Sequence, residues 1–210
     1  SRRFANSDTI FLVTLIGTIA RMQKDLDLKK SFLDIFFFLA LPLHLWSYWL
    51  LFTDLSGVAA ETDFVEAIGF GAYVLLNTLL ESLMVAVFFW LAFLLLEKFF
   101  SAQKSLAAAK ALGFVLLLFA MAGQYYYQLN NDIGSLLFRI EYHLARLGWV
   151  GLIGLIVGIF IAVALPTVFT LRKQPVAAWI NRFTERVQVV AQLYIAVDVL
   201  AIILIIFRNL

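Results

Sequence analysis

Three ionisable side chains interrupt long apolar stretches of the sequence: His44, Glu81 and Asp198. A charged group inside a bilayer costs at least about 2.5–3.5 kcal/mol, so it faces protein or a wet cavity rather than lipid. His44 lies nine residues before Thr53 and Asp198 nine before Phe207. At 1.5 Å per residue this is roughly 14 Å from the end of each apolar stretch, near the middle of a bilayer. We expect these groups to bind a proton, a cation or a small polar solute.

Glu81 also ends a polar stripe. Glu66, Tyr73, Asn77 and Glu81 recur at steps of seven, four and four residues, which places them on one helical face. The stripe could line a half-channel or ligand pocket, with Glu81 as proton acceptor or cation ligand. The alternative is the hydrogen-bonded seam of a closed bundle, with Glu81 protonated by burial or paired with His44. For His44 alone and for Asp198 alone, the structural role is favoured.

A second polar group lies between apolar stretches, on a short expected helix. Arg139, His143 and Arg146 share one side of it and are candidates for contact with lipid phosphates. An ordinary solvated helix face explains the same pattern.

Signatures of enzymes are missing. The chain has no cysteine, only two histidines, and no HExxH, P-loop or GxSxG motif. We therefore expect no catalytic residues, no metal and no cofactor. An enzyme is not excluded, but the sequence favours a protein that is not one.

The composition indicates a membrane protein. Hydrophobic residues make up 63% of the 210 residues and charged residues 14%, against roughly 45–50% and about 25% in soluble domains. The net charge of +2 gives no reason to expect a nucleic-acid partner. The lipid bilayer is the expected partner.

The fold class we predict is all-α: a polytopic bundle of five transmembrane helices with an N-terminal interfacial helix. Residues 1–30 form the interfacial segment, with Asp8–Met22 lying on the membrane, and residues 31–210 form the bundle. The alternative is a sixth span at Asp8–Met22. The five stretches long enough to cross a bilayer are 31–53, 66–97, 106–127, 148–171 and 187–207. Between the last two, Pro175–Arg186 is expected to be a separate helix lying flat on the membrane.

The basic residues are unevenly distributed. With five spans, thirteen of the sixteen lysines and arginines, Lys110 included, fall on one side. The positive-inside rule makes that side cytoplasmic, so the N-terminus is cytoplasmic and the C-terminus external. The short loops and this asymmetry favour a bacterial inner membrane.

Small residues mark one face of the fourth stretch. Gly154 and Gly158 form a GxxxG pair, which lets another backbone approach closely. The partner is either another helix of the chain, which is favoured, or a second copy or partner subunit.

Three functions fit the sequence. The first is a transport- or channel-like module that uses the midplane acidic residues. The second is a non-enzymatic anchor or assembly module, with an extracytoplasmic domain or partner attached beyond the external end at Phe207–Leu210. The third is a lipid-handling protein or intramembrane enzyme that combines His44, Glu81 and Asp198.

Overall fold

A computed structural model describes residues 27–53, 57, 63–128, 142 and 146–210. All regular structure in this part of the chain is helical. The interfacial helix predicted at Asp8–Met22 lies outside the described residues, as do Arg139 and His143. Residues 27–30, which we assigned to the interfacial segment, belong to the first described helix.

The described residues contain five helices long and apolar enough to cross a membrane. For the described residues, the number agrees with the five apolar stretches that we predicted, and four helices begin and end within a few residues of those stretches. They are the N-proximal helix Asp27–Thr53, α2 Phe64–Glu97, α3 Ala102–Gln128, α5 Trp149–Arg172 and α6 Gln174–Asn209.

The fifth helix differs from the prediction. α6 begins at Gln174 and runs unbroken through the segment we predicted to be a separate flat helix. Pro175 lies in the first turn, where its missing N–H would have had no partner within the helix. Ala177, Ile180 and Thr184 are buried, so this segment packs as part of the bundle. The prediction of a separate helix is therefore wrong.

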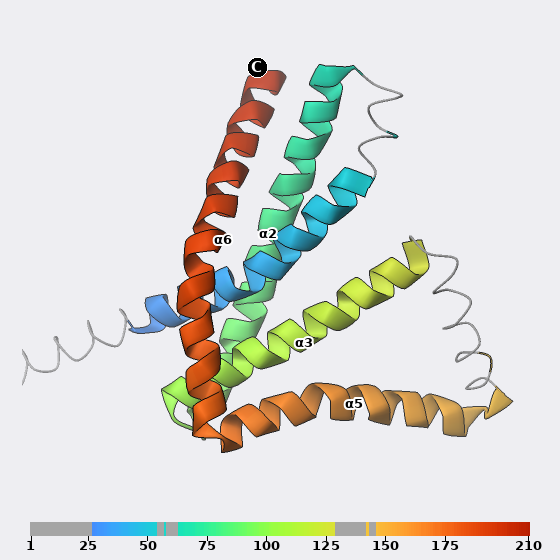
Figure 1. The fold of residues 1–210 in the computed structure, drawn as a ribbon, viewed down its shortest axis with the longest axis vertical. Coiled ribbons are helices and arrows are strands. Elements are labelled where there is room, and N and C mark those ends of the chain that lie inside the picture. The colour runs from blue at the N-terminus through green and yellow to red at the C-terminus, as the bar shows by residue number, and fades with distance from the viewer. Residues whose placement is uncertain (1–26, 54–56, 58–62, 129–141, 143–145) are drawn as a thin grey trace, which may run out of the picture.

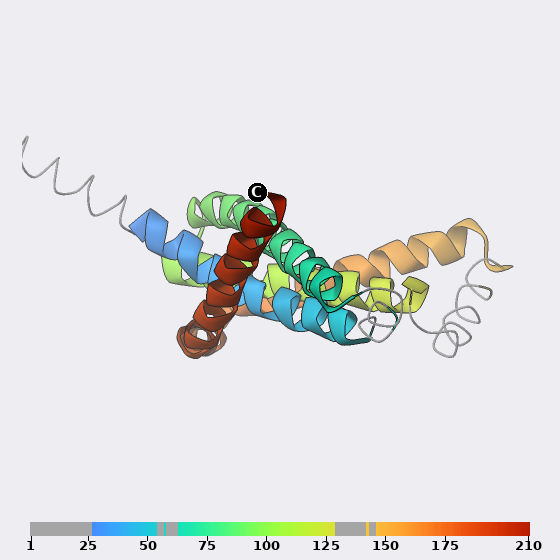
Figure 2. The same cartoon turned by 90° about the horizontal axis from the view of Figure 1, so that it is seen from above.

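The helices converge at one end and spread apart toward the other (Figures 1 and 2). We call the first the junction end, where α2 is joined to α3 and α5 to α6. The other is the open end, where α6 terminates. α3 packs against α2, α5 and α6, and α2 also packs against α6. α5 is the outermost of these diverging helices (Figure 1).

The largest core cluster joins the N-proximal helix to α2 and α3. Ile35 and Leu39 of the N-proximal helix pack there with Phe89 of α2. Gly113 brings α3 close, because a Cβ added at this position would lie 2.9 Å from a Leu39 methyl and 3.0 Å from the Phe89 ring. This core separates the two ends of the bundle.

α5 leaves its glycine face open. A Cβ added at Gly154 or Gly158 would meet nothing within 4 Å, and none of the most apolar part of α5 is buried. Among the described residues, none contacts this GxxxG face, so its partner, within the chain or on another subunit, stays a prediction.

The tight contact at Gly113 can be tested by substitution. Gly113→Val should lower the free energy of unfolding by about 1–3 kcal/mol relative to Gly123→Val, because the added carbons overpack the core. Gly123 lies on the same helix and has nothing within 4 Å of its Cβ position, so it controls for helix propensity. Thermal unfolding of the purified protein in detergent measures the difference. Equal stability of the two variants would contradict the packing described here.

Candidate functional site

His44 and Asp198 form a fully buried pair. Nε2 of His44, on the N-proximal helix, lies 2.8 Å from Oδ2 of Asp198 on α6, and both side chains are 0% exposed. Nδ1 of His44 lies 2.8 Å from the carbonyl oxygen of Ala40. A carbonyl only accepts, so Nδ1 carries a hydrogen. Nε2 then either donates to a carboxylate or accepts from a protonated carboxyl, and in both cases the pair is neutral overall and holds one shared proton.

Aromatic rings cover this pair on one side. The ring of Tyr194 stacks on the His44 imidazole with centroids 5.7 Å apart, and Tyr48 packs against Tyr194. In the described structure Oδ1 of Asp198 is buried and has no hydrogen-bond partner. A buried polar atom normally has one. The pair therefore has unused capacity to accept a hydrogen bond.

Glu81 lies at the same level but faces elsewhere. Thr78 of α2 donates a hydrogen bond of 2.8 Å to Ser47 of the N-proximal helix. The two helices are antiparallel. Glu81, three residues after Thr78, and His44, three residues before Ser47, therefore lie at the same level, one step toward the junction end. Glu81 is exposed and accepts from Nδ2 of Asn77 at 2.9 Å. The alternative in which Glu81 pairs with His44 is wrong.

Glu81 opens into a cavity of about 400 Å³, the open-end cavity. Its walls come from the N-proximal helix, α2 and α3. Nε1 of Trp46 donates a hydrogen bond of 2.6 Å to Oε1 of Gln124 across it, and Ser47 adds a hydroxyl. The cavity is amphipathic, with one carboxylate.

The predicted stripe is partly gathered here. Tyr73, Asn77 and Glu81 all line the open-end cavity, whereas Glu66 does not. The Tyr73 hydroxyl also accepts a hydrogen bond of 3.1 Å from Asn209, which ties α2 to the end of α6. Helical spacing predicted that these three side chains share one face, and they share one wall of the cavity.

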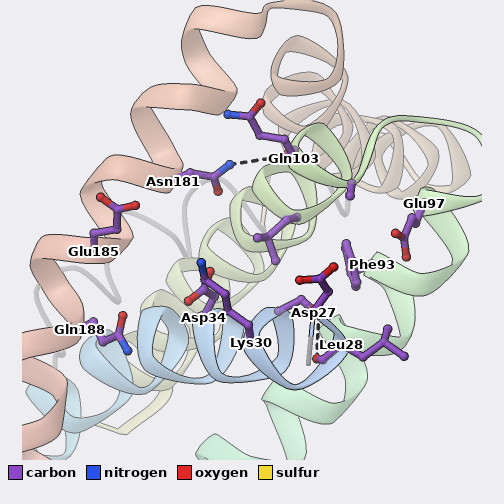
Figure 3. Close-up of a pocket in the computed structure, with 13 residues that line it drawn as sticks. Asp27, Leu28, Lys30, Asp34, Phe93, Glu97, Gln103, Asn181, Glu185 and Gln188 are labelled. Carbon is purple, nitrogen blue, oxygen red and sulfur yellow. Dashed lines mark hydrogen bonds between the residues drawn. The ribbon is translucent and has the colours of Figure 1, made fainter. Parts of the chain in front are cut away.

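A larger cavity of about 830 Å³ lies at the junction end, between the N-proximal helix, α2, α3 and α6 (Figure 3). Asn181 donates a hydrogen bond of 3.2 Å to the Gln103 carbonyl in its wall. The sequence did not predict this junction cavity, because its lining comes from four helices whose mutual packing no sequence pattern shows. The charged residues that line it are Asp27, Lys30, Asp34, Glu97 and Glu185.

Lys110 lies beside the junction cavity and is 0% exposed. Its Nζ donates to Oδ1 of Asn181 at 3.2 Å and lies 4.0 Å from Oδ2 of Asp34. The charge distribution assigns Lys110 to the cytoplasmic side; in the structure its side chain is buried rather than solvated. α3 begins at Ala102, so Lys110 lies about two turns inside the helix, where its amine reaches these polar partners.

The remaining candidate residues are separate from these cavities. Arg146 is exposed just before α5, while its two predicted companions lie outside the described residues. No group of three or more His, Cys, Asp or Glu in the described part of the chain could hold a metal ion.

Comparison with known proteins finds no matching family model, no matching curated protein and no matching solved structure. The class of the protein therefore follows from its helices and from the buried pair alone. It is a helical protein with five described helices long and apolar enough to cross a membrane, and its buried His–Asp pair lies between two polar cavities.

The pair should show energetic coupling. His44→Leu leaves the buried Asp198 without its partner and should lower the free energy of unfolding by about 1–3 kcal/mol. Adding Asp198→Leu should restore part of this loss, because two apolar side chains can then pack together. A double-mutant cycle by thermal unfolding in detergent measures the coupling. Purely additive losses would contradict a direct interaction.

Proposed function

We propose that this chain is an integral membrane protein with five transmembrane helices, and that it acts as a transport- or channel-like module for a proton, a cation or a small polar solute. One observation carries the proposal: along the N-proximal helix, a buried pair that shares a proton lies between the junction cavity and the open-end cavity. Polar or ionisable groups at membrane depth mark ion and solute pathways in many membrane proteins.

The barrier between the cavities is asymmetric along the N-proximal helix. Asp34 lines the junction cavity and lies ten residues from His44, about 15 Å at 1.5 Å per residue. Ile35, Leu39 and Phe89 fill this interval with apolar packing. In the other direction Ser47 lines the open-end cavity only one turn from His44. This supports a closed state whose pair is nearer to the open-end cavity.

The pair can gain or lose a proton only when its surroundings change. Gain or loss of a proton would leave a net charge in an apolar surrounding, which is costly unless water or a counter-charge enters. A conformational change that wets one cavity would therefore change the proton occupancy of the pair. The two processes are linked, as alternating access requires.

The charge distribution supports an orientation for this module. Lys98, Lys104, Arg172 and Lys173 lie at or near the junction-end turns between helices. By the positive-inside rule we assign the junction end to the cytoplasm, with the C-terminus outside and the N-terminal interfacial helix on the inner surface. A bacterial inner membrane remains our proposed location.

A second candidate function has its own support. The open face of α5 around Gly154 and Gly158 fits an anchor or assembly module that binds a second copy or a partner subunit. An intramembrane enzyme is less well supported, because Glu81 lines a cavity that His44 and Asp198 do not.

Substituting Asp198 tests the transport proposal. Asp198→Asn keeps a side chain that can hydrogen-bond His44 but cannot release a proton at neutral pH. In proteoliposomes with a potassium diffusion potential, a pH-sensitive dye inside should report proton flux for the wild type and at least a tenfold lower flux for Asp198→Asn.

Thr184→Val is the matched control. Thr184 is 2% exposed on the same helix, and its hydroxyl donates a hydrogen bond of 2.9 Å to the Ile180 carbonyl of that helix. Its variant should retain wild-type flux. Equal flux in Asp198→Asn and wild type would show that the pair is a structural seam, and wild-type flux no higher than in protein-free liposomes would overturn proton transport.

A further inference from the structure

We infer that the open-end cavity binds a monovalent organic ammonium ion, with Glu81 as its counter-charge. This inference rests on the proposed transport function, because it names the class of solute that the cavity would admit. It goes beyond that function in assigning a ligand chemistry to particular side chains of α2 and the N-proximal helix.

The charge of the cavity selects a cation. Glu81 is its one carboxylate, and no lysine, arginine or histidine is among the described residues that line it. Asn77 donates to Oε1 of Glu81, and this bond leaves Oε2 for a ligand. An anion would meet a carboxylate with no basic side chain beside it.

The position of Glu81 makes a counter-charge valuable. It lies 17 residues from Phe64 and 16 from Glu97, at the middle of α2. In the proposed membrane an exposed carboxylate at this depth is costly unless water or an opposite charge accompanies it. A bound ammonium ion would supply that charge.

The shape and lining favour an organic cation over a metal ion. Trp46 and Tyr73 supply the aromatic rings among the described residues that line the cavity. Behind them, the Trp46 ring packs 4.9 Å from that of Trp49, which does not line it. Indole faces attract cations by about 0.5–2 kcal/mol. Asn77, whose Nδ2 is bonded to Glu81, has its amide oxygen as an acceptor for an ammonium N–H. The volume, about 400 Å³, suits a small molecule.

The net charge of the junction cavity is a second, independent observation that favours a cation. Four carboxylates and one lysine line it, so it too is net negative. In Figure 3 Asp27 and Asp34 come from the N-proximal helix, and Glu97 and Glu185 face them from α2 and α6. Cavities of like charge on both sides of the apolar core are expected for the route of a cation.

Equilibrium binding of radiolabelled phenethylammonium to the full chain in lipid nanodiscs tests this inference. The wild type should bind it saturably, and Glu81→Gln should weaken binding at least tenfold. Glu66→Gln is the matched control: Glu66 lies on the same helix but not in the cavity, and its variant should bind as the wild type does. The neutral analogue 2-phenylethanol should compete at least tenfold more weakly than the ammonium ion.

The outcomes separate this inference from the transport proposal. No saturable binding by the wild type, or equal binding by Glu81→Gln, would overturn the ammonium site even if proton flux depends on Asp198. Binding that depends on Glu81, found together with flux that ignores Asp198→Asn, would support the site and contradict the proton-linked transport.

Discussion

The buried hydrogen bond between His44 and Asp198 is the contact on which the rest of the arrangement depends. It joins residues 154 positions apart in the chain, on the N-proximal helix and on α6. A buried donor or acceptor without a partner costs about 1–3 kcal/mol, so the pair holds these two helices in one register. That register places the junction cavity on one side of the pair and the open-end cavity on the other.

The proton pair and the inferred cation site can influence each other through charge. Glu81 and His44 lie at the same level, as the bond between Ser47 and Thr78 shows. An ammonium ion held at Glu81 would disfavour a second proton on the pair across a low-dielectric helix interface. Loss of the cation would favour it. This coupling would allow a proton on the His44–Asp198 pair to exchange for an ammonium ion at Glu81 without a direct contact between the two sites.

The sequence predicted the five long apolar helices of the described residues but not their contacts. Helical spacing predicted that Tyr73, Asn77 and Glu81 share a wall. Neither property shows which faces meet, so the partner of His44 was not predicted. The junction cavity and the burial of Lys110 depend on the convergence of four helices, which no local sequence pattern predicts. α6 was predicted too short because its first turns mix charges with apolar residues that the bundle buries.

In the proposed transport module, two cavities open on opposite sides of the membrane and the apolar core closes the path between them. The chain has no cysteine, so single cysteines can be labelled without background. A membrane-impermeant thiol reagent should reach Asn77→Cys, in the open-end cavity, only from outside and Gln188→Cys, in the junction cavity, only from the cytoplasmic side. It should not reach buried Ser82→Cys from either side. Labelling of both cavity positions from the same side would contradict the account.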